Sequence, residues 1–156
     1  MEGQEIGWLL FGIFLFIAAM QDLRSKQVEL WVFILFGILA FGLKVFLWLR
    51  SGTSICWWEH LKESCLGLGL LGLGKFCQGE IGAGDGLFFL ISGWLLGFRE
   101  NLLMFYGGVM FCGLYAMTTF VWYRICKKTK IGKVTIPFLP FVAVWGVVWI
   151  SVQSLF

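Results

Sequence analysis

The sequence predicts an all-α membrane protein whose chain crosses the bilayer six times. Hydrophobic residues make up 60% of the 156 positions and charged residues only 13%, whereas soluble domains carry about 25% charged residues. Apolar stretches alternate with short polar ones, and a helix needs about 20 mostly apolar residues to span a bilayer. These observations argue against a soluble fold, and the length suits a single membrane-embedded domain, residues 1–156.

The first three spans are expected in the N-terminal half of the chain. Ile6–Met20 forms a short first span and Leu30–Leu49 a second, interrupted only by Lys44, which we expect to snorkel to the interface. Cys65–Phe76 is about half a span, so the third helix should draw its first turns from residues 60–64. Its glycines should let neighbouring helices approach closely: Gly67, Gly69, Gly72 and Gly74.

The last three spans follow a glycine-rich stretch. Leu87–Phe98 is short unless the fourth helix begins inside that stretch, and Arg99–Asn101 is expected to form a polar turn. Leu102–Ile125 gives a long fifth span. Pro137–Val152 gives the sixth, because proline is tolerated near the first turn of a helix.

The distribution of positive charge predicts the orientation of the protein in the membrane. Eight lysines and arginines fall in the first, third and fifth loops, and three fall on the opposite side. The positive-inside rule then places both termini outside and the odd-numbered loops in the cytoplasm. In this topology Asp22, at the end of the first span, and Asp85, at the start of the fourth, lie at one depth on the cytoplasmic side.

The stretch Gly79–Gly86 combines four glycines with two carboxylates. Acidic residues are costly at membrane depth, so Asp85 is a candidate functional residue. We expect Gly82 and Gly84 to adopt backbone dihedrals closed to other residues and to leave room for a second chain. Glu80 and Glu29 lie on the same face, where they are either solvated loop acids or groups that attract a basic peptide.

Two carboxylates at the same depth can share a proton if their helices are neighbours. One can then activate a water while the other supplies a proton, as in aspartic proteases. Asp22 lies at a helix C-terminus, where negative charge is disfavoured, so we expect it to hold the shared proton. Each acid could instead be an ordinary boundary residue in the headgroup zone.

Other side chains give weaker indications. His60 is the single histidine, and the five cysteines lack CxxC spacing, so no metal or cofactor is expected. The basic residues 127–133 adjoin a span, which favours contact with anionic lipid over nucleic acid.

The positions of these motifs resemble the GxGD membrane aspartyl proteases, and more narrowly the prepilin and preflagellin peptidase family. The resemblance rests on Asp22-Leu23-Arg24 after the first span, on Gly82-Ala83-Gly84-Asp85, and on Pro137–Phe141 at the last span. It covers essentially the whole chain. This chain departs from the family pattern at Leu87, where a lysine is common, and at Val28-Glu29, where Ile-Pro is common.

The resemblance implies that Asp22 and Asp85 are catalytic and that the protein removes leader peptides from pilin-like precursors at the cytoplasmic face of the cell membrane. It also implies the short form of the family, without the cytoplasmic domain associated with N-methylation. Two alternatives remain open: a small transporter or proton-coupled channel that uses the two acids as a relay, and a non-catalytic membrane subunit.

Overall fold

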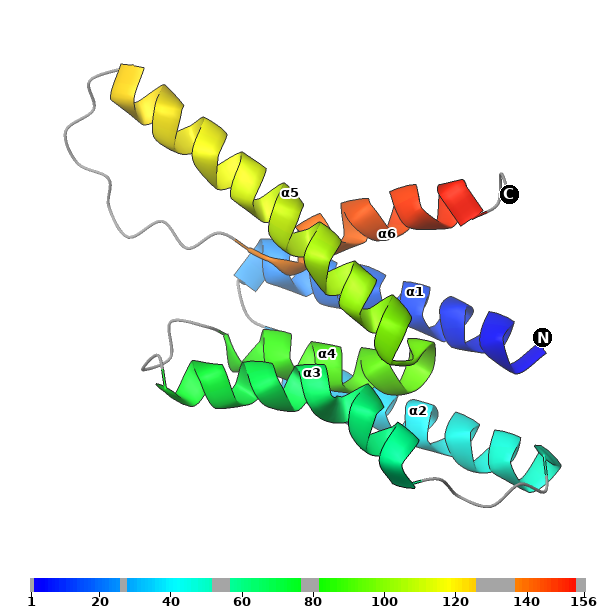
Figure 1. Cartoon of the computed structure of the whole chain (residues 1–156). Coiled ribbons are helices and arrows are strands. Elements are labelled where there is room, and N and C mark those ends of the chain that lie inside the picture. Colours follow the sequence, from blue (N-terminus) through cyan, green and yellow to red (C-terminus); the bar gives the residue numbers. More distant parts are fainter. Residues whose placement is uncertain (1, 26–27, 52–56, 77–81, 126–136, 154–156) are drawn as a thin grey trace.

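The computed structural model describes residues 2–25, 28–51, 57–76, 82–125 and 137–153. Within these ranges the chain forms helices and no strand. Figure 1 shows the helices in chain order: α1 (Glu2–Ser25), α2 (Leu30–Ser51), α3 (Trp57–Phe76), α4 (Ala83–Leu96), α5 (Phe98–Ile125) and α6 (Leu139–Gln153).

Each described helix coincides with one of the predicted apolar segments. α3 begins at Trp57 and α4 at Ala83, so both draw on the polar residues that precede their apolar runs, as predicted. α1 continues to Ser25 instead of ending at Met20. As a result, Asp22 lies within the last turn of α1, and the helical backbone fixes its position.

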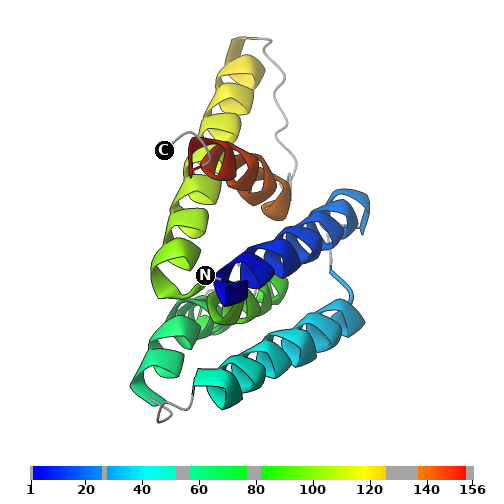
Figure 2. The same ribbon diagram turned by 90° about the vertical axis from the view of Figure 1, so that its right-hand side faces the viewer.

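The helices form a bundle with α4 in the middle. α4 packs against α1, α2, α3 and α5, while α6 packs against α1 and α5. The two chain termini lie at the same end of the bundle (Figure 1), and Figure 2 shows α5 and α6 on one side of α1, with α2 on the other. α1 ends, and α2, α4 and α6 begin, at the opposite end. We call it the aspartate end, because it contains Asp22 and Asp85.

A cluster of phenylalanine rings joins α1, α2 and α4 close to the aspartate end. The buried ring of Phe14 stacks on Phe36 and Phe88, with centroids 4.7 and 4.8 Å away. Phe88 follows Asp85 by almost one turn, and Phe14 precedes Asp22 by about two turns. The rings therefore fix α1 and α4, which carry the two aspartates, relative to each other.

Glycines bring α3 and α4 into backbone contact. A Cβ added at Gly67 would lie 2.5 Å from the Cβ of Leu90, and one added at Gly86 would lie 2.7 Å from the Cγ of Leu71. A Cβ at Gly69 or Gly72 would meet nothing within 4 Å. The prediction of close approach is thus confirmed for Gly67 and wrong for Gly69 and Gly72, which face away from neighbouring helices.

The connection between α4 and α5 is a single glycine. Gly97 has φ 87°, a left-handed conformation that favours glycine, and α5 begins at the next residue. The prediction of a polar turn at Arg99–Asn101 is therefore wrong, because these residues form the first turn of α5. Asn101 is buried, accepts a hydrogen bond from Ser92 (2.7 Å) and donates one to the Phe89 carbonyl (2.8 Å).

The outer surface of the bundle suits a lipid environment. Among the described residues, three helices are long and apolar enough to cross a membrane: α1 over Glu5–Ser25, α2 over Leu30–Arg50, and α5. α4 and α6 are shorter apolar helices. Large hydrophobic side chains such as Leu9, Phe16 and Ile34 are more than half exposed. An apolar surface of this extent would be unfavourable in water but is suited to contact with lipid.

Candidate active site

Asp22 continues the buried face of α1. Phe11, Leu15 and Ala18 precede it at helical spacing and are all buried, and Asp22 itself is only 9% exposed. Its Oδ2 accepts a hydrogen bond from the backbone N–H of Leu139, at the start of α6, with an N to O distance of 3.1 Å. Asp22 is therefore a buried carboxylate held between two helices.

Asp85 lies in the first turn of α4. Gly82 is the residue before the helix, and its carbonyl accepts a hydrogen bond of 3.1 Å from the Asp85 N–H. No side chain caps this helix N-terminus. Free N–H groups and the helix dipole at this position stabilise a nearby negative charge, so α4 itself provides a favourable place for a carboxylate.

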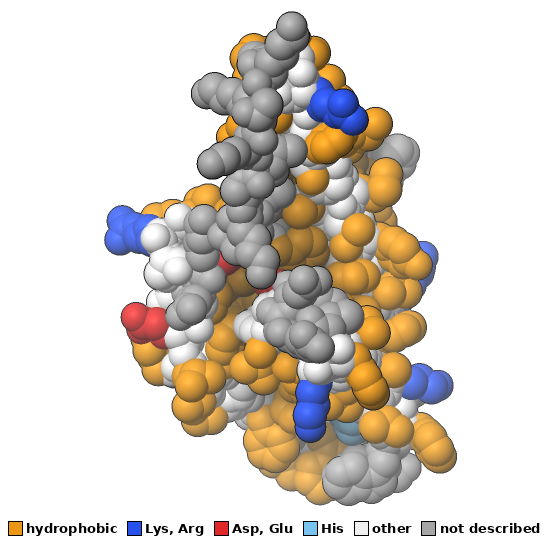
Figure 3. Space-filling view, turned by 90° about the vertical axis from the view of Figure 1, so that its left-hand side faces the viewer, with side chains coloured by type: hydrophobic (Ala, Val, Ile, Leu, Met, Phe, Trp, Pro, Cys, Tyr) orange, Lys and Arg blue, Asp and Glu red, His pale blue; other side chains and the backbone are white. Residues whose placement is uncertain are grey.

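The structure brings the two predicted acids together. The carboxyl groups of Asp22 and Asp85 lie close enough for their charges to interact, although they are on different helices and far apart in the sequence. The thiol of Cys112, on α5, is also within range of Asp85. Figure 3 views the aspartate end, where acidic side chains are visible among hydrophobic ones. The arrangement gathers two carboxyl groups at one end of the bundle.

Sequence reasoning missed two contributors to this site. The sequence assigns no role to Cys112, because no motif distinguishes it from the other cysteines. The Leu139 N–H is a backbone group, so its presence beside Asp22 depends on where α6 packs. The Pro137–Phe141 segment contributes to the family resemblance, but no sequence feature pairs it with the first helix.

The glycines of the motif do not adopt the expected conformations. Gly82 has φ −61° and ψ 125°, which any residue can adopt, and Gly84 is helical. The prediction that they use dihedrals closed to other residues is wrong. A Cβ at Gly82 would lie 3.4 Å from Oδ2 of Asp85, and one at Gly84 would meet only Phe33, at 3.9 Å. The first turn of α4 is therefore almost bare of side chains beside Asp85.

Glu29 and Glu80 are the other two acids predicted at the aspartate end, and the structure describes only Glu29. Glu29 is exposed at the aspartate end, just before α2, and its N–H donates a hydrogen bond of 3.1 Å to the side-chain oxygen of Gln21. Its carboxylate accepts a hydrogen bond from the Trp31 indole. Glu80 lies outside the described residues. Within the described ranges, no three His, Cys, Asp or Glu side chains gather in a way that could hold a metal ion.

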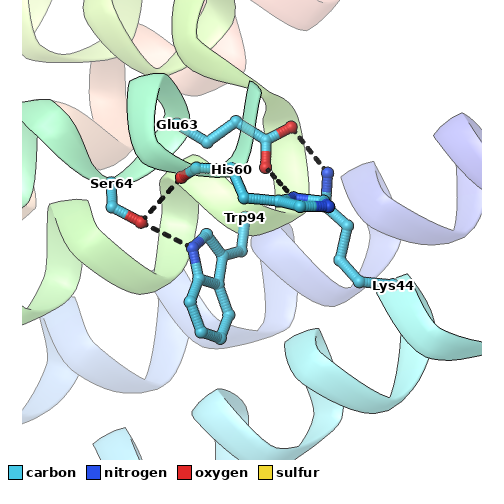
Figure 4. A network of polar contacts seen from close by, with 5 residues as sticks. All are labelled: Lys44, His60, Glu63, Ser64 and Trp94. Atoms are coloured by element: carbon cyan, nitrogen blue, oxygen red, sulfur yellow. Dashed lines mark hydrogen bonds and ion pairs between the residues drawn. The ribbon is translucent and has the colours of Figure 1, made fainter. Parts of the chain in front are cut away.

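A second polar cluster lies toward the opposite end of the bundle (Figure 4). The Lys44 ammonium on α2 forms an ion pair of 2.6 Å with Glu63 on α3, and Glu63 also contacts the His60 ring at 3.2 Å. Ser64 accepts a hydrogen bond of 2.7 Å from the Trp94 indole. Lys44 therefore has a carboxylate partner on the neighbouring helix, which the sequence did not predict.

The apolar helices and the paired carboxyl groups at one end of the bundle define an integral membrane protein with a candidate acid–base site. The chain belongs to the type IV leader peptidase family, whose family model matches residues 9–117. The matched segment contains Asp22 and Asp85 and ends before α6. Comparison with curated proteins and with solved structures gave no match.

Membership of this family identifies a peptidase and implies that prepilin-like proteins are its substrates. It does not favour the transporter or channel alternative.

Proposed function

We propose that this protein is an aspartyl endopeptidase that removes the leader peptides of pilin-like precursors, with Asp22 and Asp85 as its catalytic residues. One observation carries the proposal: two carboxyl groups, from helices distant in sequence, lie close enough for their charges to interact at one end of a mostly apolar bundle. Acids are rare at membrane depth without a functional reason. Two carboxyl groups that share one proton are the arrangement with which aspartic proteases hydrolyse peptides.

In the proposed mechanism, the two carboxyl groups share one proton, because like charges in close contact resist simultaneous ionisation. The ionised carboxylate accepts a proton from a water as the water oxygen attacks the scissile carbonyl carbon. The protonated carboxyl group donates its proton to the carbonyl oxygen. The C–N bond of the resulting tetrahedral intermediate then breaks: the leaving nitrogen takes up a proton from one carboxyl group, and a hydroxyl of the intermediate returns its proton to the other, which restores the singly protonated dyad. No metal or cofactor takes part.

The substrate backbone can bind beside the first turn of α4, which carries few side chains there. Gly82 and Gly84 leave space beside Asp85, so an extended peptide can approach the carboxyl group closely. Glu29 and Glu80, which precede α2 and α4 in the sequence, add negative charge that would attract the basic leader of a precursor.

We further propose that all six helices cross the membrane, with the N-terminus outside and the odd-numbered loops in the cytoplasm. The charge distribution of the sequence supports this orientation. The aspartate end then faces the cytoplasm, and the apolar helix of the precursor stays in the bilayer, where lipid surrounds both proteins.

The decisive experiment is precursor cleavage by matched variants. The protein is co-expressed with a pilin-like precursor, and the precursor length is followed on a gel. We expect Asp22→Asn and Asp85→Asn each to lower the cleavage rate by about 10²–10⁴-fold, because each removes one proton-transfer group without changing side-chain size. Glu100→Gln is the matched control, since Glu100 contacts Trp149, on a different helix, away from the aspartate end.

The outcomes separate the candidate functions. Cleavage that survives in both aspartate variants would exclude the proposed dyad. Proton or solute flux in reconstituted vesicles, lost in the same variants while the precursor stays intact, would instead support the transport alternative.

A further inference from the structure

The first turn of α6 lies directly against Asp22. α6 begins at Leu139, and the N–H of this residue donates to Oδ2 of Asp22 over 3.1 Å in a buried position. α6 lies beyond residue 117, where the family match ends. A segment outside the matched region therefore contacts one of the two proposed catalytic residues.

The backbone N–H groups in the first turn of α6 have few partners outside that turn. A helix N-terminus leaves its first N–H groups without partners inside the helix. Here Pro140 has no N–H, and the Phe141 N–H bonds to the Phe138 carbonyl at 3.1 Å. The Leu139 N–H is directed at another helix, where Oδ2 of Asp22 accepts its hydrogen bond, and the backbone N–H of Phe138 acts on the same carboxyl group.

This donor is held firmly relative to α4. The Leu139 side chain is 1% exposed. The neighbouring ring of Phe138 packs against Phe89 of α4 and Phe105 of α5, with centroids 6.1 and 6.3 Å away. Because α4 also carries Asp85, the Leu139 N–H has a fixed position relative to both acids.

We propose that the backbone N–H of Leu139 is a positioning group for catalysis, which fixes the orientation of the Asp22 carboxyl group toward Asp85. The inference rests on the proposed function of the two aspartates. With Oδ2 held by the Leu139 N–H, the Asp22 carboxyl group keeps one orientation at the aspartate end. A hydrogen bond to a charged acceptor is also stronger and shorter than one between neutral groups, which suits it to orienting a carboxylate.

Leu139→Pro tests this role with little disturbance of the helix. Proline is favoured at the first position of a helix, where the N–H makes no intrahelical bond, so the variant removes the donor and keeps α6. Leu139→Ala is the matched comparison, because it removes the buried side chain and keeps the N–H. Both are assayed with the full-length protein in detergent, on a pilin-like precursor, with turnover expressed per folded molecule.

We expect Leu139→Pro to lower kcat by roughly 10- to 100-fold, consistent with the loss of one hydrogen bond to a charged group, while KM changes little. Leu139→Ala should lose clearly less kcat per folded molecule, and its melting temperature should be lower than that of wild type because a buried side chain is lost. Equal losses of kcat in the two variants would overturn the proposal, because packing alone would then explain both. So would an unchanged kcat in Leu139→Pro.

A second measurement does not depend on the folding of the proline variant. In hydrogen exchange, the Leu139 amide should stay protected in Asp22→Asn, which keeps an oxygen acceptor, and lose protection in Asp22→Ala. Equal protection in both would overturn the contact itself. Cleavage by Asp22→Asn at the wild-type rate would refute the proposed function, whereas loss of cleavage in Asp22→Asn with unchanged kcat in Leu139→Pro would refute only the role of Leu139.

Discussion

Two glycines of α3 offer a sharp test of how helix packing supports the site. Gly67 and Gly69 are in the same helix, and Ala can replace either of them. A Cβ at Gly67 would lie 2.5 Å from the Cβ of Leu90 and closer still to the Leu90 backbone, whereas a Cβ at Gly69 would meet nothing within 4 Å. The same substitution should therefore have opposite effects at the two positions.

The structure gives the expected magnitudes. Carbon atoms pack at about 3.5–4.0 Å, so Gly67→Ala requires α3 and α4 to separate by about 1 Å. Overpacking of this kind costs roughly 1–3 kcal/mol, and more where backbone must move. Both variants gain about 0.5–1 kcal/mol in helix propensity. Gly69→Ala should thus equal or exceed wild-type stability, and Gly67→Ala should be less stable than Gly69→Ala by about 1–3 kcal/mol.

The same displacement should affect catalysis more than stability. α4 carries Asp85, and Leu90 lies on the same helix, so a shift of α4 changes the distance between Asp85 and Asp22. A misplacement of about 1 Å can cost about 10²-fold in rate. We therefore expect Gly67→Ala to lose most precursor cleavage while a large fraction of the protein remains folded.

Thermal unfolding in detergent, combined with precursor cleavage per folded molecule, measures both effects. Gly69→Ala controls for helix propensity and for the change of residue type. If Gly67→Ala has the same stability and cleavage rate as Gly69→Ala, the close backbone contact between α3 and α4 is refuted. The idea that this contact sets the position of Asp85 is then refuted as well.

Three further substitutions test other contacts by thermal unfolding. Phe14→Ala should cost about 3–5 kcal/mol, because it leaves a cavity between the rings of α2 and α4; a loss below about 1 kcal/mol would contradict this packing. Lys44→Met should cost about 1.5–3 kcal/mol, because Glu63 loses its lysine partner and keeps only the contact with the His60 ring. Lys44→Met combined with Glu63→Met should recover most of that loss; strict additivity would argue against the ion pair. Trp149→Phe should cost about 1 kcal/mol through its hydrogen bond to Glu100, and no further loss should follow when Glu100→Gln is added.

The proximity of Asp22 and Asp85 could be predicted because the membrane restricts the fold. A helix that crosses a bilayer must return on the other side, so counting apolar segments assigns each loop to a face. That count placed the end of the first helix and the start of the fourth at one end. The contacts that complete the arrangement, such as Phe14 on Phe36 and Phe88, are between apolar residues that the sequence does not distinguish from others facing lipid.

The roles of individual glycines and charges could not be predicted in the same way. Gly67 and Gly69 have similar sequence surroundings, yet only Gly67 faces α4. Which residues of a helix face a neighbour depends on its rotation about its axis, and an evenly apolar helix gives little indication of that rotation. The sequence likewise did not pair Lys44 with Glu63, because the two residues become neighbours only once α2 and α3 are placed side by side.

The charge state of Asp22 shows why an argument from a single helix is insufficient. The C-terminus of α1 disfavours negative charge, and on that basis Asp22 was expected to hold the shared proton. In the structure, however, the N-terminus of α6 meets the same carboxyl group through the Leu139 N–H. This second helix end favours negative charge, so the dipoles of α1 and α6 act on Asp22 in opposite directions. The helix dipoles at Asp22 therefore do not by themselves assign the proton. The Leu139→Pro variant removes the Leu139 hydrogen bond while both helices stay in place, so it isolates the effect of this hydrogen bond on the charge state of Asp22.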